Sequence, residues 1–236
     1  MSNSVVITSA VRTAVGSMNK SLKNIPGDEL GSVVISEAIK RSKITKEEVD
    51  EVIMGQVLTG GTGQNPARQA AIKSGIPKEK PAYIVNQVCG SGIRSIVSGF
   101  QSIKAGDSKI IIAGGQENMS LAPHSIHLRD GKKLGNANMT DTMINDGLWD
   151  AFHNYHMGIT AENVATKFQV KRDDQDKFAL NSQNKAIKAQ KEKKFNDEIV
   201  NIKIKSKNSE IDFGKDEHPR EGIKLDILSR LKPVFK

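Results

Sequence analysis

The chain contains one cysteine, Cys89, and its neighbours are residue types that accompany a nucleophilic thiol. It lies in Val85-Asn86-Gln87-Val88-Cys89-Gly90-Ser91-Gly92-Ile93-Arg94, where an apolar strand is expected to turn through small residues into a helix. A thiol at a helix N-terminus faces unpaired backbone N–H groups and the positive end of the helix dipole, and both favour the thiolate over the thiol. The small neighbours also leave room for a substrate. We therefore predict that Cys89 is a nucleophile.

The competing interpretation is an inert buried thiol, since free cysteines are among the most buried residue types. Gly90, Ser91 and Gly92 have poor or middling helix propensity, so helix stability does not explain their presence around the thiol. Beyond them, apolar residues recur at helical spacing and a glycine follows as a stop: Ile93, Ile96, Val97, Phe100, Ile103 and Gly106. This spacing predicts a helix that begins at Cys89 and buries that apolar face.

Two other patterns could do chemistry but point to it less strongly. Residues 60–64, Gly-Gly-Thr-Gly-Gln, precede a helix but lack the lysine and hydroxyl of a P-loop and the spacing of a dinucleotide fingerprint, so a turn is expected. His124 and His127, like His153 and His156, are three residues apart, a spacing open to zinc. No cysteine pair or HExxH glutamate accompanies them, so we predict no metal site.

The composition is typical of a soluble globular protein. The 236 residues, 37% hydrophobic and 26% charged, can form one or two domains with a substantial core. One cysteine excludes an intrachain disulfide framework, and no opening apolar run resembles a signal peptide or a membrane span, so a cytoplasmic location without a membrane partner is expected. The net charge of +8 comes without the aromatic patterns of nucleic-acid-binding modules. It favours a phosphorylated small ligand over nucleic acid.

The elements expected to position Cys89 alternate along the first 116 residues. Apolar runs predict strands at residues 5–7, 52–54, 83–85 and 110–112, and helices are predicted over 28–40, over 65–74 and after Cys89. This alternation predicts an α/β fold with a mostly parallel sheet covered on both faces. Asn65 is expected to cap its helix, with Pro66 in the first helical position.

The pattern changes after Gly114-Gly115. Residues 119–155 show no clear long period and predict an extended functional loop region. Helices are then expected over 158–168 and over 173–194, the second with acidic residues at its start and basic residues at its end. Alternating polarity predicts an exposed strand over 199–205.

Several separated strings together resemble the thiolases, in particular the biosynthetic acetoacetyl-CoA thiolases. The three longest are Asn86-Gln87-Val88-Cys89-Gly90-Ser91-Gly92, Ala113-Gly114-Gly115-Gln116-Glu117-Asn118-Met119-Ser120 and His156-Met157-Gly158-Ile159-Thr160-Ala161-Glu162-Asn163-Val164-Ala165. Shorter matches occur at Val11-Arg12-Thr13, at residues 63–69 and at residues 231–235, so the likeness spans the chain. It implies a layered α-β-α thiolase domain over residues 1–120 and an inserted α+β CoA-binding loop domain over residues 121–236, incomplete at its C-terminal end.

The resemblance implies a reversible Claisen condensation, a step of lipid and fatty acid metabolism. Cys89 matches the residue that takes an acetyl group from acetyl-CoA and passes it to a second acetyl-CoA, giving acetoacetyl-CoA and CoA. Its backbone N–H matches one donor of an oxyanion hole. The implied CoA contacts are His156 and Met157 at the pantetheine and acyl group, Leu148 and Phe235 as apolar contacts, and Arg220 near the adenosine diphosphate. The CoA thioesters are substrates, so no cofactor is implied.

The resemblance also implies partners. The segment that contains His127, Arg129, Lys132 and Lys133 resembles the loop through which tetrameric members associate, so a homotetramer is expected.

One departure from the family pattern is large. The family's catalytic set includes a histidine in a Gly-His-Pro motif and a second cysteine in a Cys-x-Gly-x-Gly motif, and this sequence contains neither. The pair His218-Pro219 lacks the glycine, and Ile227 stands where relatives often carry a hydroxyl. General acid–base help is typically worth ~10²–10⁴-fold, so negligible turnover is expected of the 236-residue chain alone.

Two alternatives stay open. A degradative 3-ketoacyl-CoA thiolase shares the nucleophile but takes longer acyl chains, although the pair His156-Met157 and the long loop favour the short-chain type. The other is a chain without turnover of its own that acts only as a subunit or binding module.

Overall fold

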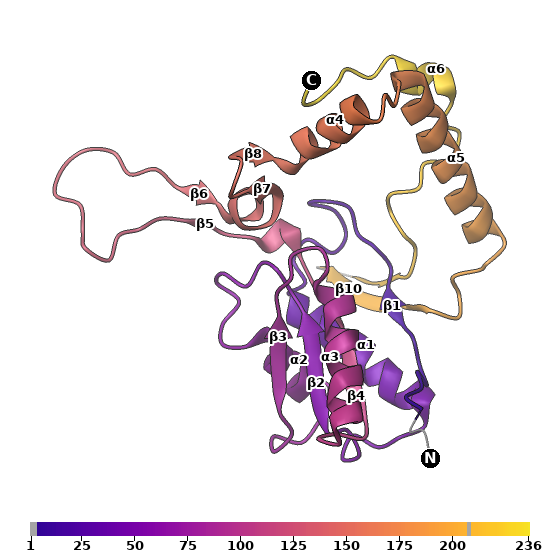
Figure 1. Ribbon diagram of the computed structural model, residues 1–236. Coiled ribbons are helices and arrows are strands. Elements are labelled where there is room, and N and C mark those ends of the chain that lie inside the picture. Colours follow the sequence, from indigo (N-terminus) through magenta and orange to yellow (C-terminus); the bar gives the residue numbers. More distant parts are fainter. Residues whose placement is uncertain (1–3, 207–208) are drawn as a thin grey trace. The chain divides into compact units, whose positions relative to one another are not determined.

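The computed structural model describes residues 4–206 and 209–236, and the chain divides into two compact units (Figure 1). The first unit comprises Met1–Gly147 with Glu198–Lys215, and the second comprises Leu148–Asp197 with Asp216–Lys236. The family-based boundary at residue 120 stays a prediction.

The first unit is built on a three-stranded parallel sheet in the order β3-β2-β4. Its strands are β2 (Glu51–Gly55), β3 (Ala82–Val85) and β4 (Ile111–Gly115). Parallel neighbours need crossover connections, and the helices α2 (Pro66–Lys73) and α3 (Ser91–Ala105) supply them. Helix α1 (Gly27–Ser42) and α2 lie on one face of the sheet and α3 on the other (Figure 1). The predicted α/β fold with a parallel sheet is confirmed.

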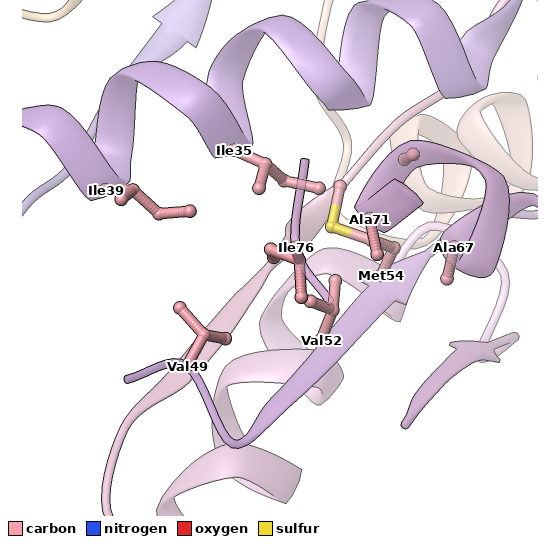
Figure 2. Packing of buried hydrophobic residues seen from close by; sticks show 9 residues of the cluster. Ile35, Ile39, Val49, Val52, Met54, Ala67, Ala71 and Ile76 are labelled. Atoms are coloured by element: carbon pink, nitrogen blue, oxygen red, sulfur yellow. The ribbon is translucent and has the colours of Figure 1, made fainter. Parts of the chain in front are cut away.

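The central strand β2 divides its side chains between two layers, because successive residues of a strand point to opposite faces. Val52 and Met54 join a fully apolar cluster with residues of α1 and α2, shown in Figure 2. The other members of this cluster are Ile35, Ile39, Val49, Ala67, Ala70, Ala71 and Ile76. Ile53 is equally buried but points toward α3. Burying side chains of this size stabilises the fold by about 1.5–3 kcal/mol each.

The predicted start of α2 is confirmed. Pro66 is the first helical residue, and the Asn65 side chain accepts a hydrogen bond from the Arg68 N–H at 3.2 Å. Asn65 has a φ of 43°, in the left-handed region that asparagine tolerates better than most residues. The cap was predictable because it depends only on neighbouring residues.

The predicted buried face of α3 is wrong. The helix buries Ser91, Ser95 and Gly99. Of the predicted apolar face, Ile103 is half-buried and the others are exposed, Ile93 by 74% and Phe100 by 47%. The small face allows the helix to approach the sheet closely, since a Cβ added to Gly99 would lie 3.1 Å from a methyl group of Ile111. The helix also begins at Ser91 with Gly90 as its N-cap, so Cys89 precedes it.

The strand predicted at residues 5–7 is absent from the described structure. These residues have no strand pairing, and Val6 and Ile7 are 70% and 77% exposed. Together with α1, α3 and β4, residues 5–13 line a mainly apolar cavity of about 610 Å³. β4 is an edge strand of the sheet. Ile110 and Gln116 hydrogen-bond toward β2, and in a strand the residues that bond to one neighbour alternate with those that face the other side. Ile111, Ala113 and Gly115 therefore direct their backbone groups to the open edge. An apolar run forms a strand only where a partner strand accepts its hydrogen bonds.

Shorter pairings complete the first unit. Parallel strands β1 (Arg12–Thr13) and β9 (Ile199–Val200) pair, and β10 (Ile202–Ser206) and β11 (Ser209–Phe213) form an antiparallel ladder. The strand predicted over 199–205 is therefore divided between two pairings at Asn201. After the 3₁₀ turn η1 (Met119–Leu121), β5 (His124–Ser125) pairs with β6 (Thr140–Asp141), and η2 (Met143–Leu148) is a π-helical turn.

The second unit contains a hairpin and three helices. Strands β7 (Trp149–Asp150) and β8 (Tyr155–His156) pair antiparallel and lead into α4 (Met157–Lys167), α5 (Arg172–Lys191) and α6 (Leu225–Ser229). The Arg172 guanidinium donates to the carbonyls of Leu228 and Leu231, at 2.7 and 2.9 Å, and so joins α5 to α6. Both helices predicted in this region are confirmed to within a few residues. None of the helices in the described parts of the chain is long and apolar enough to cross a membrane.

Candidate active site

The thiol of Cys89 is exposed on a tight turn between β3 and α3. The preceding residue, Val88, has a φ of 46°, a conformation that a β-branched side chain adopts only under strain. Such strain persists only where surrounding contacts hold it, and it clusters at functional sites. The turn therefore exposes Cys89 through a backbone conformation at Val88 that is unfavourable by itself and must be held by surrounding contacts.

Ser91 holds this turn in place. Its Oγ accepts from the Gln87 N–H at 2.9 Å and donates to the Val88 carbonyl at 2.6 Å, and its own N–H donates to the same carbonyl at 3.1 Å. The Asn86 side chain accepts from the Val88 N–H at 3.0 Å. Because Ser91 is 4% exposed, water does not compete for these bonds. Ser91 thus fixes the backbone on both sides of Cys89.

Gly55, the last residue of β2, lies directly beneath the start of α3. A Cβ built on Gly55 would lie 2.5 Å from the carbonyl carbon of Ser91 and 2.6 Å from the nitrogen of Gly92. Only glycine permits this approach, since every larger residue would meet backbone atoms. The depth at which the Cys89 turn sits on the sheet therefore depends on Gly55.

Glu117, two residues after the end of β4, supports the same region. Its carboxylate accepts from the Val57 N–H at 2.8 Å and from the Leu58 N–H at 3.3 Å, and the Val57 carbonyl accepts from the Asn86 side chain at 3.5 Å. Since Asn86 also bonds to Val88, hydrogen bonds connect Glu117 to the turn that carries Cys89.

The burial of Glu117 has a consequence that can be measured. Burial raises the pKa of Glu117 above its ordinary value of 4.5, although its bonds to Val57 and Leu58 oppose the shift. A carboxyl whose pKa is raised by folding stabilises the native state fully below its unfolded-state pKa, and that contribution is lost as pH rises through the folded pKa. We expect Glu117→Gln to remove this decline. As pH rises above about 4.5, the free energy of unfolding of the parent should therefore fall relative to that of the variant. Urea titrations between pH 4 and 8 measure this; parallel profiles would contradict it.

In the second unit, His156 and Phe235 lie together. Their rings are stacked, with centroids 4.9 Å apart and planes inclined by 23°. His156 is the N-cap of α4, and its Nδ1 accepts from the Gly158 N–H at 2.9 Å. Two residues predicted from the resemblance, 79 positions apart, are thus brought into one contact.

The other predicted CoA contacts are positioned by different elements of this unit. Met157 is the first residue of α4 and is exposed, whereas Leu148 is half-buried at the end of η2. Arg220 is exposed, and its backbone N–H donates to the Gln183 side chain of α5 at 2.8 Å. Ile227 lies exposed on α6.

The residues expected to mediate association lie between β5 and β6. His127, Arg129, Lys132 and Lys133 are all exposed there, on the long connection seen in Figure 1. Within the described ranges, no three His, Cys, Asp or Glu side chains are grouped to hold a metal ion.

The sequence reasoning missed several residues that shape the site. Ser91 and Gly55 had no assigned role, and the string at residues 113–120 was recognised without one. In the structure Gln116 donates to Gln56 at 2.9 Å, and Asn118 donates to the carbonyls of Leu22 and Ile25. The sequence signal that could have indicated these residues was the run of small and amide residues directly after each apolar strand.

The structure thus places an exposed thiol on a strained strand-to-helix turn at the end of a parallel sheet. The family model described as "Thiolase, N-terminal domain" matches residues 5–236. The chain therefore belongs to the thiolase family.

Individual relatives agree with this assignment. An acetyl-CoA acetyltransferase of Rhizobium meliloti (strain 1021) is 55% identical over 236 residues, which are 100% of this chain and 60% of that protein. A cytosolic acetyl-CoA acetyltransferase of Rattus norvegicus is 52% identical over 234 residues, 99% of this chain and 59% of that protein. The crystal structure of the Bacillus anthracis acetyl-CoA acetyltransferase matches with a TM-score of 0.94 and 39% identity, over 98% of this chain and 59% of that one. The chain thus spans about 60% of the length of these relatives.

Proposed function

We propose that Cys89 accepts an acetyl group from acetyl-CoA and serves the condensation of two acetyl-CoA molecules to acetoacetyl-CoA and CoA, or its reverse. The observation that carries the proposal is the exposed thiol on a turn fixed by Ser91 and Asn86. That turn belongs to a chain 55% identical to a protein named acetyl-CoA acetyltransferase.

The first half of the reaction needs only the nucleophile and a donor for the oxyanion. The Cys89 thiolate attacks the thioester carbonyl, the tetrahedral intermediate collapses, and the CoA thiolate leaves and is protonated. The Cys89 N–H is proposed to stabilise the oxyanion, since the N–H groups of Gly90 and Ser91 already bond to Gln87 and Val88.

The second half needs groups that this sequence does not hold. A base must remove the α-proton of the second acetyl-CoA before its carbon attacks the acetylated Cys89. The sequence has no Gly-His-Pro motif and no second cysteine. The 236-residue chain is therefore proposed to be acetylated but to have negligible turnover by itself. In this respect the proposal agrees with the alternative of a subunit that does not turn over on its own.

The substrate contacts are proposed from the resemblance. His156 and Met157 would face the pantetheine and acyl group, Leu148 and Phe235 would supply apolar contacts, and Arg220 would lie near the adenosine diphosphate. The stacking of Phe235 on His156 supports placing these two residues in the same part of the substrate site. The names of the relatives support an acetyl rather than a longer acyl group, so the degradative 3-ketoacyl-CoA thiolase is the second candidate.

The remaining expectations are part of the same proposal. No cofactor is needed because the CoA thioesters are the substrates. The exposed basic loop between β5 and β6 supports self-association, with a homotetramer proposed. The word "cytosolic" in the name of the rat relative supports a cytoplasmic location.

Mass spectrometry tests the proposal directly. After incubation with acetyl-CoA and an acid quench, the intact chain is expected to gain one acetyl group, mapped by peptide analysis to Cys89. Addition of free CoA is expected to remove it, because the exchange is reversible. Acetylation confined to lysines would contradict the proposed nucleophile, and acetoacetyl-CoA formation at the rate of an intact thiolase would contradict the predicted lack of turnover.

A further inference from the structure

Gly158, the second residue of α4, provides the space in which the Phe235 ring lies. A Cβ built on Gly158 would overlap three atoms of that ring, Cε2, Cζ and Cδ2. The same ring stacks on the imidazole of His156, with centroids 4.9 Å apart. A side chain at position 158 would therefore displace Phe235 from both the helix and His156.

The hydrogen bond at the start of α4 also defines the state of His156. Its Nδ1 accepts from the Gly158 N–H at 2.9 Å and so carries no proton. In a neutral imidazole the proton then lies on Nε2, which becomes a donor. Nε2 has no hydrogen-bond partner within the part of the chain that the structure describes. The stacked pair thus combines one free N–H donor with an apolar ring face.

We infer that Gly158 is a positioning residue: by lacking a side chain it seats Phe235 on His156, and the seated imidazole presents Nε2–H to a carbonyl oxygen of the pantetheine arm. This inference rests on the proposed function, since it needs a CoA thioester as the ligand. The pantetheine arm alternates amide or thioester carbonyls with methylene groups, which suits a donor beside an apolar surface. Met157, 38% exposed at the first position of α4, extends that surface.

A double-mutant cycle tests the inference on the 236-residue chain. The variants are Gly158→Ala, Phe235→Leu and the two together. If the added methyl group acts by displacing the ring, Gly158→Ala has little further effect once the ring is gone, so the two changes are non-additive. The measurements are calorimetric titration with CoA, which has no acyl group to transfer, and ¹⁵N NMR of the imidazole side chains, with His156 assigned by its loss in His156→Gln.

We expect the parent to show an unprotonated Nδ1 and a protonated Nε2 at His156. Gly158→Ala is expected to mix the tautomers and to weaken CoA binding by about two- to tenfold, the size of one net hydrogen bond. The double variant is expected to match Phe235→Leu alone. An unchanged tautomer and affinity in Gly158→Ala, or fully additive effects, would overturn the inference.

Two further outcomes distinguish a failure of this inference from a failure of the proposed function. A parent chain that binds no CoA would overturn the proposed function, while the tautomer signals would still decide the role of Gly158. Should Gly158→Ala fail to fold by circular dichroism, Phe235→Leu alone decides: mixed tautomers with weaker CoA binding support the stacked arrangement, and unchanged values refute it.

Discussion

Replacement of Cys89 by serine is expected to abolish acetyl transfer from acetyl-CoA to the chain, with the rate of incorporation falling by more than about 10³-fold. A serine hydroxyl is not ionised near pH 7, and the side chains that hydrogen-bond within this turn, Asn86 and Ser91, are not bases that could activate it. Radiolabelled acetate retained on the acid-precipitated chain measures the effect. The thermal unfolding of Cys89→Ser is expected to match the parent, since the thiol is exposed and serine is close to it in size.

Ser91→Ala distinguishes the nucleophile from the turn that carries it. The variant keeps the thiol but loses the bonds to Gln87 and Val88. It is expected to retain acetylation at a reduced rate and to lose about 1–3 kcal/mol of stability, because the part-buried Gln87 N–H is left without its acceptor. Label retained by Cys89→Ser at the level of the parent would show that the acetyl group is carried elsewhere.

Local features of this fold were predictable from the sequence. The cap formed by Asn65 and Pro66 and the acidic start of α5 depend on residues within one helical turn. The alternation of apolar runs and helices was enough to predict the parallel sheet, since a helical crossover is the usual connection between parallel strands. The position of Cys89 before a helix followed in the same way, with an error of two residues at the helix start.

Features that depend on distant neighbours were not predictable. The apolar residues of α3 follow the helical period, yet the sheet packs against the opposite face, because the small side chains of Ser95 and Gly99 permit the closer approach. Residues 5–7 have strand-like composition but find no partner strand. Composition reports which residues prefer burial, whereas the neighbouring elements determine which of them are covered.

The candidate site shows the same division. The role proposed for Cys89 came from its small neighbours, and the roles proposed for His156 and Phe235 came from a resemblance. The strain at Val88 and the bonds of Ser91 that hold it have no signature in residue type alone. Close approaches such as that of Gly55 to α3 also arise only when the sheet and the helix are assembled.

Gly55→Ala is expected to lower the free energy of unfolding by about 1–3 kcal/mol and to slow the reactions of Cys89. The new methyl group would lie 2.5 Å from the carbonyl carbon of Ser91 and 2.6 Å from the nitrogen of Gly92. These are backbone atoms at a helix start, which cannot rotate away as a flexible side chain would. The start of α3 must therefore move off the sheet and carry the Cys89 turn with it. Urea unfolding measures the first effect, and the rate of reaction with a small aromatic disulfide measures the second, since Cys89 is the only thiol.

Gly92→Ala is the matched control, because it adds the same methyl group on the helix side of this contact, where no atom beyond the local helix backbone lies within 4 Å of the new Cβ. Gly92 is inside α3, so alanine there is expected to stabilise the helix by about 0.4–1 kcal/mol. A loss of stability in Gly55→Ala together with a gain in Gly92→Ala would show that the close packing of β2 against the start of α3 positions the thiol. The loss of a glycine in itself would not explain opposite changes in stability. Equal effects of the two variants on stability and on thiol reactivity would refute this, since the contact beneath the turn would then have no special role.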